Sequence, residues 1–234
     1  MSALLAANRL FVGQVAVVTG ASSGVGEAIA LGLAEHGADV VLIGRHIARL
    51  QAVAIRAERH GVKARCYQTE LTRDESIAET IASLRREFEK LDLLIHSAGV
   101  FRSGNTRVAA ITDFDLQYST NLRAPYLLTQ SLLPLICEKF GQIVFINSMA
   151  SMGAKAGAGQ YAATKAGLKA VADSLRQEVA RDMRVLTVFL GSTATPMQQT
   201  IFAMKGREYM PERLIQPADA AQAVISTLAL PRTV

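Results

Sequence analysis

The stretch that decides the fold is VAVVTGASSGVG, which runs from Val15 to Gly26. Four consecutive apolar residues, 15–18, end at a turn rich in glycine and serine, and a helical pattern follows from about 26 to 36. Apolar runs without polar alternation are typical of strands that are buried on both faces. The stretch therefore predicts a strand, a glycine-rich turn and a helix in immediate succession.

The rest of the chain repeats this alternation of short apolar runs and longer helical patterns. Such alternation is typical of βαβ units with a parallel sheet. We expect further strands at 39–43, 64–68, 91–96, 142–147 and 185–190, and helices at about 48–60, 74–88, 114–137, 160–181 and 217–228. The sequence therefore predicts the α/β class: a Rossmann-type, doubly wound parallel sheet of six strands with helices on both faces.

Length and composition indicate a single globular domain over residues 1–234, because 50% of the residues are hydrophobic and no linker interrupts the pattern. No apolar run approaches the roughly 20 residues that span a bilayer, and no basic leader precedes an apolar core, so we expect no membrane association. The two cysteines, Cys66 and Cys137, are too few for a disulfide framework. We therefore expect a cytoplasmic protein.

The glycine-rich turn has the spacing G-x-x-x-G-x-G, formed by Gly20, Gly24 and Gly26. In a dinucleotide site the first glycine permits a tight exit from the strand, the second lets the backbone approach a pyrophosphate, and the third allows close packing of helix on strand. The N-terminus of the following helix offers free N–H groups and a positive dipole end. Glycine and serine are also ordinary turn residues, but this position in an alternating chain favours a dinucleotide site.

The tip of the second strand distinguishes NAD from NADP. A carboxylate there would bind the ribose 2′-hydroxyl and repel a 2′-phosphate. This chain has Arg45 instead, with Arg49 one helical turn further on, and arginine pairs well with phosphate. A solvated basic helix face is the alternative, and it suits Arg56 and Arg59 better than Arg45. We therefore expect NADP(H), with NAD(H) as the less favoured cofactor.

A second constellation can carry acid–base chemistry. Tyr161 and Lys165 are four residues apart at the start of a helical pattern, so their side chains share one face. A neighbouring ammonium favours the phenolate and would lower the tyrosine pKa from about 10. Ser148 stands just past the fifth strand, at the edge where open α/β sheets bind ligands. The three residues together indicate a proton-transfer site.

These residues carry a resemblance that covers essentially the whole chain. The glycine turn after Thr19, Asn121, Ser148 and the Tyr161–Lys165 segment, with Ser148 thirteen residues before Tyr161, resemble the short-chain dehydrogenase/reductase family. The resemblance implies hydride transfer between nicotinamide and a carbonyl or alcohol substrate. It implies a catalytic tetrad in which Tyr161 exchanges the proton, Ser148 steadies the substrate oxygen, Lys165 binds the nicotinamide ribose, and Asn121 holds a relay water.

The motifs and the resemblance together predict the cofactor-binding residues, which are Gly20, Ser22, Ser23, Gly24, Val25, Gly26, Arg45, Glu70, Leu71, Ala98, Gly99, Tyr161, Lys165, Gly191, Thr193 and Thr195. The resemblance also places a substrate lid at about 196–211. There the apolar residues Ile201, Phe202 and Met204 suggest a modest apolar substrate. It further implies a homodimer or homotetramer.

Three departures from the family pattern have expected consequences. His96-Ser97 replaces two asparagines, which we expect to soften the support of the central sheet while cofactor binding survives. Leu190 replaces a proline, which removes a rigid φ and would loosen the following loop. The seventh strand usual in the family has no counterpart in the pattern after 228.

Two other functions remain open on this sequence. A non-catalytic NADP(H)-sensing protein of the same fold would fit the altered motifs, and turnover would distinguish it from an enzyme. A nucleic-acid-binding protein would use the basic residues between 45 and 65, but the net charge of +5 comes without a polybasic tail, so we expect no such partner. The four histidines show no metal-ligand spacing, and we expect no metal.

Overall fold

The computed structural model describes residues 9–136, 140–180 and 182–231, and these form one parallel sheet of six strands. The strands lie in the order β3-β2-β1-β4-β5-β6. Their bounds are β1 Val15–Thr19, β2 Asp39–Gly44, β3 Ala64–Gln68, β4 Leu93–His96, β5 Gln142–Ser148 and β6 Arg184–Leu190. The order reverses direction between β1 and β4, which is the switch point where ligands bind in open α/β sheets.

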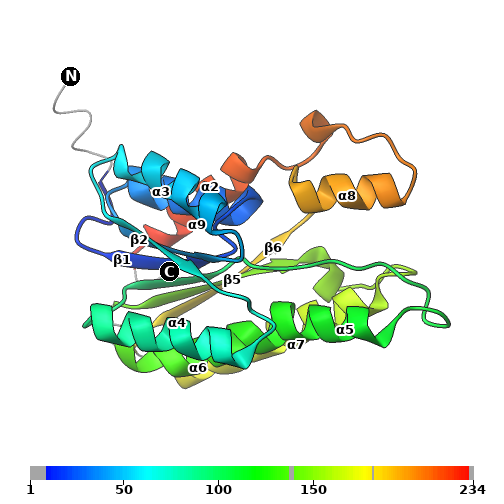
Figure 1. The fold of residues 1–234 in the computed structure, drawn as a ribbon, viewed down its shortest axis with the longest axis horizontal. Helices are drawn as coiled ribbons and strands as arrows, with labels where there is room; N and C mark the ends of the chain where they lie inside the picture. Colours follow the sequence, from blue (N-terminus) through cyan, green and yellow to red (C-terminus); the bar gives the residue numbers. More distant parts are fainter. Residues whose placement is uncertain (1–8, 137–139, 181, 232–234) are drawn as a thin grey trace.

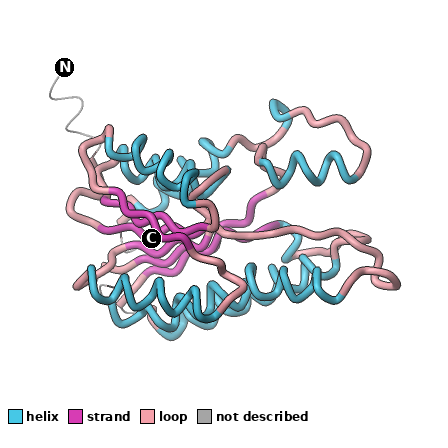
Figure 2. Tube along the Cα trace, in the orientation of Figure 1, coloured by secondary structure: helices cyan, strands magenta, loops and turns pink. Residues whose placement is uncertain are grey.

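Helices cover both faces of this sheet (Figures 1 and 2). One layer contains α2 (Gly24–Glu35), α3 (Ile47–Glu58) and α9 (Pro217–Leu228). The opposite layer contains α4 (Asp74–Glu87), α5 (Ile111–Tyr118), α6 (Ala124–Leu132) and α7 (Gly159–Glu178). The predicted doubly wound, Rossmann-type architecture is therefore confirmed.

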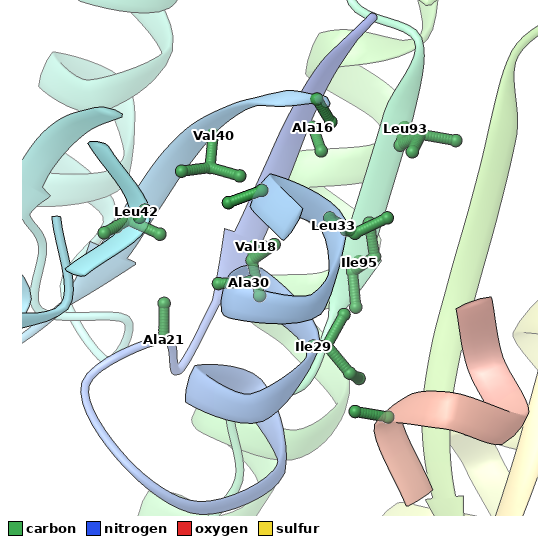
Figure 3. Close-up of a cluster of buried hydrophobic side chains, with 14 of the residues drawn as sticks. Ala16, Val18, Ala21, Ile29, Ala30, Leu33, Val40, Leu42, Leu93 and Ile95 are labelled. Carbon is green, nitrogen blue, oxygen red and sulfur yellow. The ribbon is translucent and has the colours of Figure 1, made fainter. Parts of the chain in front are cut away.

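The apolar run at 15–18 is continuous because β1 is buried on both sides. Ala16 and Val18 pack with Leu33 of α2 in one core cluster, whereas Val17 belongs to the cluster on the opposite face. Figure 3 shows the first cluster, with side chains of β1, β2 and β4 directed at α2. Full burial of an aliphatic side chain contributes about 1.5–3 kcal/mol. Both faces of the sheet therefore stabilise the strand that leads into the glycine turn.

The helix predicted at 114–137 corresponds to an unbroken helical run from Ile111 to Leu135, but the run is not α-helical throughout. The helical run is divided into α5, a π-helical turn at Ser119–Arg123, α6, and a 3-10 turn at Leu133–Leu135. Apolar periodicity does not reveal a π turn, which widens the helix locally and is frequent at functional sites. The predicted end at Cys137 lies outside the described residues.

Other boundaries moved by a few residues. α2 begins at Gly24 rather than Gly26, and α7 ends at Glu178, while Arg181 lies outside the described residues. The predicted lid region contains a helix, α8 (Pro196–Met204), that the pattern did not indicate. Within the described ranges no seventh strand joins β6, and no described helix is long and apolar enough to cross a membrane.

Candidate active site

A cavity of about 610 Å³ lies along the carboxyl edge of the sheet, where the loops after the strands converge. The predicted cofactor-binding residues all line it, as do three of the four predicted catalytic residues. The exception is Asn121, which is fully buried behind the cavity wall. The structure therefore brings together residues that follow each of the six strands. Sequence spacing could place each of these residues at the end of its own strand but could not show that they line one cavity.

The glycine turn forms one wall of the cavity at the N-terminus of α2. A Cβ on Gly26 would lie 2.4 Å from the carbonyl oxygen of Gly20, so a larger residue would push the helix away from the strand. Gly24 has a φ of +59°, which side chains other than glycine rarely adopt. The first N–H groups of α2 have no partner within the helix and adjoin the cavity. This arrangement suits a phosphate group.

Thr19 connects the turn to the neighbouring strand, a contact that the sequence did not reveal. Its hydroxyl donates to the carbonyl oxygen of Ile95 at 3.4 Å and accepts from the N–H groups of Ser97 and Ala98 at 3.1 and 3.2 Å. The loop after β4 is therefore fixed against the end of β1. That loop carries Ala98 and Gly99 into the cavity wall.

Basic side chains mark the end of the cavity next to β2. Arg45 and Arg49 line it and are exposed. The carbonyl oxygen of Arg45 accepts a hydrogen bond from the side chain of Gln68 at 3.1 Å, which ties the tip of β2 to the end of β3. Glu70 also lines this end, and its carboxylate accepts from the N–H and hydroxyl of Thr72 at 3.2 and 3.0 Å.

Tyr161, Ser148 and Lys165 meet at the other end of the cavity. The ammonium of Lys165 is buried, donates to the carbonyl oxygen of Ile146 at 3.1 Å, and lies 6.0 Å from the centre of the Tyr161 ring. Phe101 packs edge-on against Tyr161, with ring centres 5.1 Å apart. The phenol is thus held by packing on one side and by polar residues on the other.

Burial controls the protonation of this group. It raises the pKa of Tyr161 above its ordinary value, and a hydrogen bond with Ser148 opposes that rise. Burial also lowers the pKa of Lys165 to about 8. Removal of the phenol from water outweighs the Ser148 hydrogen bond, so the net shift is opposite to the lowering expected from Lys165, whose effect on the phenolate stays a prediction. The phenol is protonated near neutral pH.

Two buried asparagines brace the catalytic end. The amide of Asn121, in the π turn, donates to Val100 O at 2.9 Å and to Thr164 Oγ1 at 3.2 Å, and it accepts from Val100 N at 2.8 Å. The side chain of Asn147 donates to the carbonyl oxygen of Lys165 at 3.1 Å and accepts from the N–H of Ser148 at 2.8 Å. The sequence analysis missed Asn147, although it directly precedes Ser148.

His96 fills the position where the family has asparagine. It is buried, its Nε2 lies 2.8 Å from Thr129 Oγ1, and its ring stacks on Phe145 with centres 4.9 Å apart. Burial lowers its pKa to about 3, so the ring is neutral at physiological pH. The other ring nitrogen, Nδ1, is buried without a hydrogen-bond partner among the described residues, so the histidine replaces the asparagine only in part, and the softening of the sheet stays a prediction.

The loop after Leu190 is also tied down despite the missing proline. Leu190 remains paired with Ser148 in the sheet. Further along, the N–H of Ala194 donates to the carbonyl oxygen of Ile215 at 2.8 Å, and the N–H of Ile215 donates to that of Ser192 at 3.0 Å. Thr195 then caps α8 by accepting from the N–H of Gln198 at 3.3 Å. Backbone hydrogen bonds tie this loop to Ile215, and the loosening expected from the missing proline stays a prediction.

Several cavity residues were not among the sequence predictions: Phe101, Lys155 and Lys205. Phe101 follows the Ala98-Gly99 turn closely, which was the available signal for it. Of the apolar lid residues, Ile201 lines the cavity, whereas Phe202 packs on Tyr209 instead, with ring centres 5.7 Å apart. Among the described residues no group of three or more histidines, cysteines or carboxylates could hold a metal ion.

Comparison with known proteins identifies the family. A family model described as short chain dehydrogenase matches residues 14–206. The chain belongs to the short-chain dehydrogenase family. Within that family it is 32% identical over 225 residues to an uncharacterized oxidoreductase of Staphylococcus aureus (strain MRSA252), covering 94% of this chain and 93% of that protein. The family resemblance stated from the sequence motifs is therefore confirmed.

Solved structures of this short-chain dehydrogenase fold agree with the architecture. An alcohol dehydrogenase from the archaeon Thermococcus sibiricus, complexed with 5-hydroxy-NADP, matches with a TM-score of 0.86 at 25% identity, over 94% of this chain and 92% of that one. A metagenomic short-chain oxidoreductase in complex with NADP matches with a TM-score of 0.83 at 30% identity, over 96% and 94% of the two chains. The similarity covers nearly the whole fold, including the strands and turns that carry the cavity.

Proposed function

We propose that the chain is an NADP(H)-dependent oxidoreductase that interconverts a carbonyl and an alcohol, with Tyr161 as the proton donor or acceptor. One observation carries the proposal: Tyr161, Ser148 and Lys165 line the same cavity as the glycine turn and Arg45. The alternative, an NADP(H)-sensing protein without turnover, would not need a buried lysine beside a tyrosine and serine.

The residues present fit a nicotinamide dinucleotide phosphate. The N-terminus of α2 and the Gly24 backbone would hold the pyrophosphate, and Arg45 with Arg49 would pair with a 2′-phosphate. The related structures in complex with NADP or 5-hydroxy-NADP support the same preference. When bound, the cofactor supplies or accepts the hydride at the substrate carbon.

The protein's own part in the reaction is proton transfer and positioning. In reduction, the phenol of Tyr161 would donate its proton to the developing alkoxide, while the hydroxyl of Ser148 holds the same oxygen. The ammonium of Lys165 would bind the nicotinamide ribose and stabilise the phenolate left on Tyr161. Burial raises the pKa of Tyr161, which favours the protonated phenol that the reduction requires.

Asn121 has a positioning role in this proposal. Its amide nitrogen and oxygen are engaged by Val100 and Thr164, so its side chain has less room for the relay water implied by the family resemblance. It would instead hold the loop after β4 beside the π turn and α7.

We also propose that residues 196–211, with α8, act as the substrate lid. Assembly as a homodimer or homotetramer and a cytoplasmic location stay predictions.

The test begins with thermal unfolding in the presence of NADP⁺ or NAD⁺. A ligand at about 100 times its dissociation constant adds about 2.7 kcal/mol, and for a chain of this size each kcal/mol raises Tm by about 2–4 °C. We expect a clear rise with NADP⁺, a smaller one with NAD⁺, and then oxidation of NADPH with a panel of aldehydes and ketones. No rise with either nucleotide would contradict the proposal, and tight binding without turnover across the panel would favour the sensor.

A further inference from the structure

Two lysines that the proposed reaction does not use line the same cavity. Lys155 lies in the loop between the 3-10 turn at Met149–Ser151 (η3) and α7, and Lys205 directly follows α8. Both are exposed and both line the cavity. In the part of the chain that the structure describes, neither makes an ion pair, whereas Lys90 and Lys169 each pair with an aspartate. Two uncompensated ammonium groups therefore border the same space.

The cavity offers these lysines no acidic partner of its own. Glu70 is the only carboxylate among the described residues that line it. It follows β3, at the edge of the sheet opposite to β6, and it is engaged with Thr72. An anionic group that entered beside Lys155 and Lys205 would therefore meet no other carboxylate of the described cavity lining.

The lysines also stand apart from the arginines assigned to the cofactor. Arg45 follows β2, whereas Lys155 follows β5 and Lys205 follows β6 by way of α8. In the strand order, β2 and β5 are three strands apart, which is roughly 14 Å at the usual strand spacing. The lysines come from two different layers, because α8 lies on the same side of the sheet as α2 and α3, and α7 lies on the other (Figure 1).

Apolar side chains line the same cavity as the two lysines and Tyr161. Phe101, Met149, Met197 and Ile201 all line the cavity. The combination of an apolar wall and cationic groups is suited to a compound with a hydrocarbon body and an anionic end.

We propose that the substrate is a carbonyl or alcohol compound that bears an anionic group, a carboxylate or a phosphate ester, on an apolar chain, and that Lys155 and Lys205 recognise this anion. The inference rests on the proposed function. The reacting carbonyl oxygen is bound by Tyr161 and Ser148, while the anion lies towards the lid. The lysines are specificity-determining residues and take no part in proton transfer.

The test compares matched substrates with the wild-type enzyme and NADPH: an aliphatic oxo acid, its methyl ester, and an oxo alkyl phosphate of the same chain length. We expect the kcat/KM for the better anion to exceed that for the ester by roughly ten-fold or more and to fall with added salt. The value for the ester should be insensitive to salt. The arm that is preferred, acid or phosphate, identifies which anion the site takes.

Three variants test the residues. Lys155→Gln and Lys205→Gln should each lower kcat/KM for the preferred anion by about 3–10-fold, because contacts of an exposed ammonium are modest, and leave the ester within about two-fold. Lys63→Gln, an exposed lysine outside the cavity, is the control and should change neither.

Three results would overturn the inference. Equal kcat/KM for the anions and the ester would contradict recognition of an anion by the lysines, while the proposed function would still stand. A rise in the Kd of NADPH in Lys155→Gln or Lys205→Gln, with the ester affected as much as the acid, would assign the lysines to the cofactor instead. No turnover of any of the three substrates, nor of the wider carbonyl panel, would contradict the proposed function, and the inference with it.

Discussion

The two ends of the cavity are built in different ways. The end next to β1 and β2 presents backbone N–H groups, glycines and exposed arginines. The end next to β5 and α7 depends on buried side chains, since Asn121, Asn147 and Lys165 are all at most 5% exposed and each has a hydrogen-bond partner. In the proposed function, one end would bind the nucleotide mainly through backbone groups, and the other would act through individual side chains.

This difference determines how each end should respond to change. Backbone N–H groups persist when side chains are replaced, so binding at the nucleotide end should weaken gradually. A buried polar group that loses its partner leaves that partner unsatisfied at a cost of about 1–3 kcal/mol. Turnover should therefore fall steeply when a single side chain at the catalytic end is replaced.

The sharpest test of this contrast is Tyr161→Phe. The substitution removes the phenol proton but keeps the ring against Phe101. We expect turnover to fall by about 10²–10⁴-fold, the usual contribution of a positioned proton donor, while the Kd of NADPH changes by less than about two-fold. Steady-state oxidation of NADPH and titration of cofactor fluorescence measure the two quantities. Retained turnover would remove Tyr161 from the proton transfer.

Ser148→Ala should have the next largest effect. The serine hydroxyl would hold the substrate oxygen, and it also lowers the pKa of Tyr161. We expect kcat to fall by on the order of 100-fold, as for loss of one donor to a developing oxyanion. Because Ser148→Thr retains a hydroxyl, it is the matched variant and should keep more of the activity. Equal losses in both variants would indicate a packing defect instead.

The residues that local spacing could predict are those whose roles depend on near neighbours in the chain. The glycine turn follows directly from a strand, and Tyr161 and Lys165 share a helix face because they are four residues apart. The continuous apolar run at 15–18 likewise indicated a strand covered on both faces. These signals were enough to predict the sheet and the turn, and to place Tyr161 and Lys165 on one helix.

Other features depend on distant parts of the chain, and spacing could not reveal them. The π turn at 119–123 coincides with contacts from Asn121 to Val100 and Thr164, which lie on two other segments. The raised pKa of Tyr161 results from burial by the assembled fold. Lys155 and Lys205 border one cavity although 50 positions separate them in the sequence. Such juxtapositions exist only once the sheet is formed.

A third prediction concerns the strand at the switch point of the sheet. The pKa of His96 is about 3 in the folded state, below the value of about 6.5 expected when it is unfolded. As the pH falls below 6.5, His96 becomes protonated in the unfolded chain but stays neutral in the folded chain. The free energy of unfolding therefore decreases. This one group should lower the free energy of unfolding by roughly 2–3 kcal/mol between pH 7 and pH 4.5.

Urea denaturation across this pH range provides the measurement, with His96→Asn as the variant. The free energy of unfolding of the variant should decrease less steeply on acidification than that of the wild type. The difference in slope should be that of about one proton, roughly 1.4 kcal/mol per pH unit. The exposed histidine in His60→Asn is the matched control and should leave the slope as in the wild type. Parallel curves for His96→Asn and the wild type would contradict a neutral buried His96.

Of these four variants, the one at the nucleotide end of the cavity should have the smallest effect. It also tests directly whether the two ends differ in their dependence on single side chains. Arg45→Ala should raise the Kd of NADPH by roughly 5- to 30-fold, about 1–2 kcal/mol, since a charged but exposed contact is lost. The Kd of NADH should change little, because NADH has no 2′-phosphate. Arg59→Ala removes an exposed arginine that does not line the cavity, and isothermal titration should show no change for it.

If Arg45→Ala instead abolished NADPH binding altogether, the nucleotide end would also depend on a single side chain. The contrast between a backbone-built end and a side-chain-built end would then be wrong. A partial loss that shrinks with added salt would support it, because salt screens an exposed arginine but hardly affects hydrogen bonds from the α2 N-terminus and the Gly24 backbone.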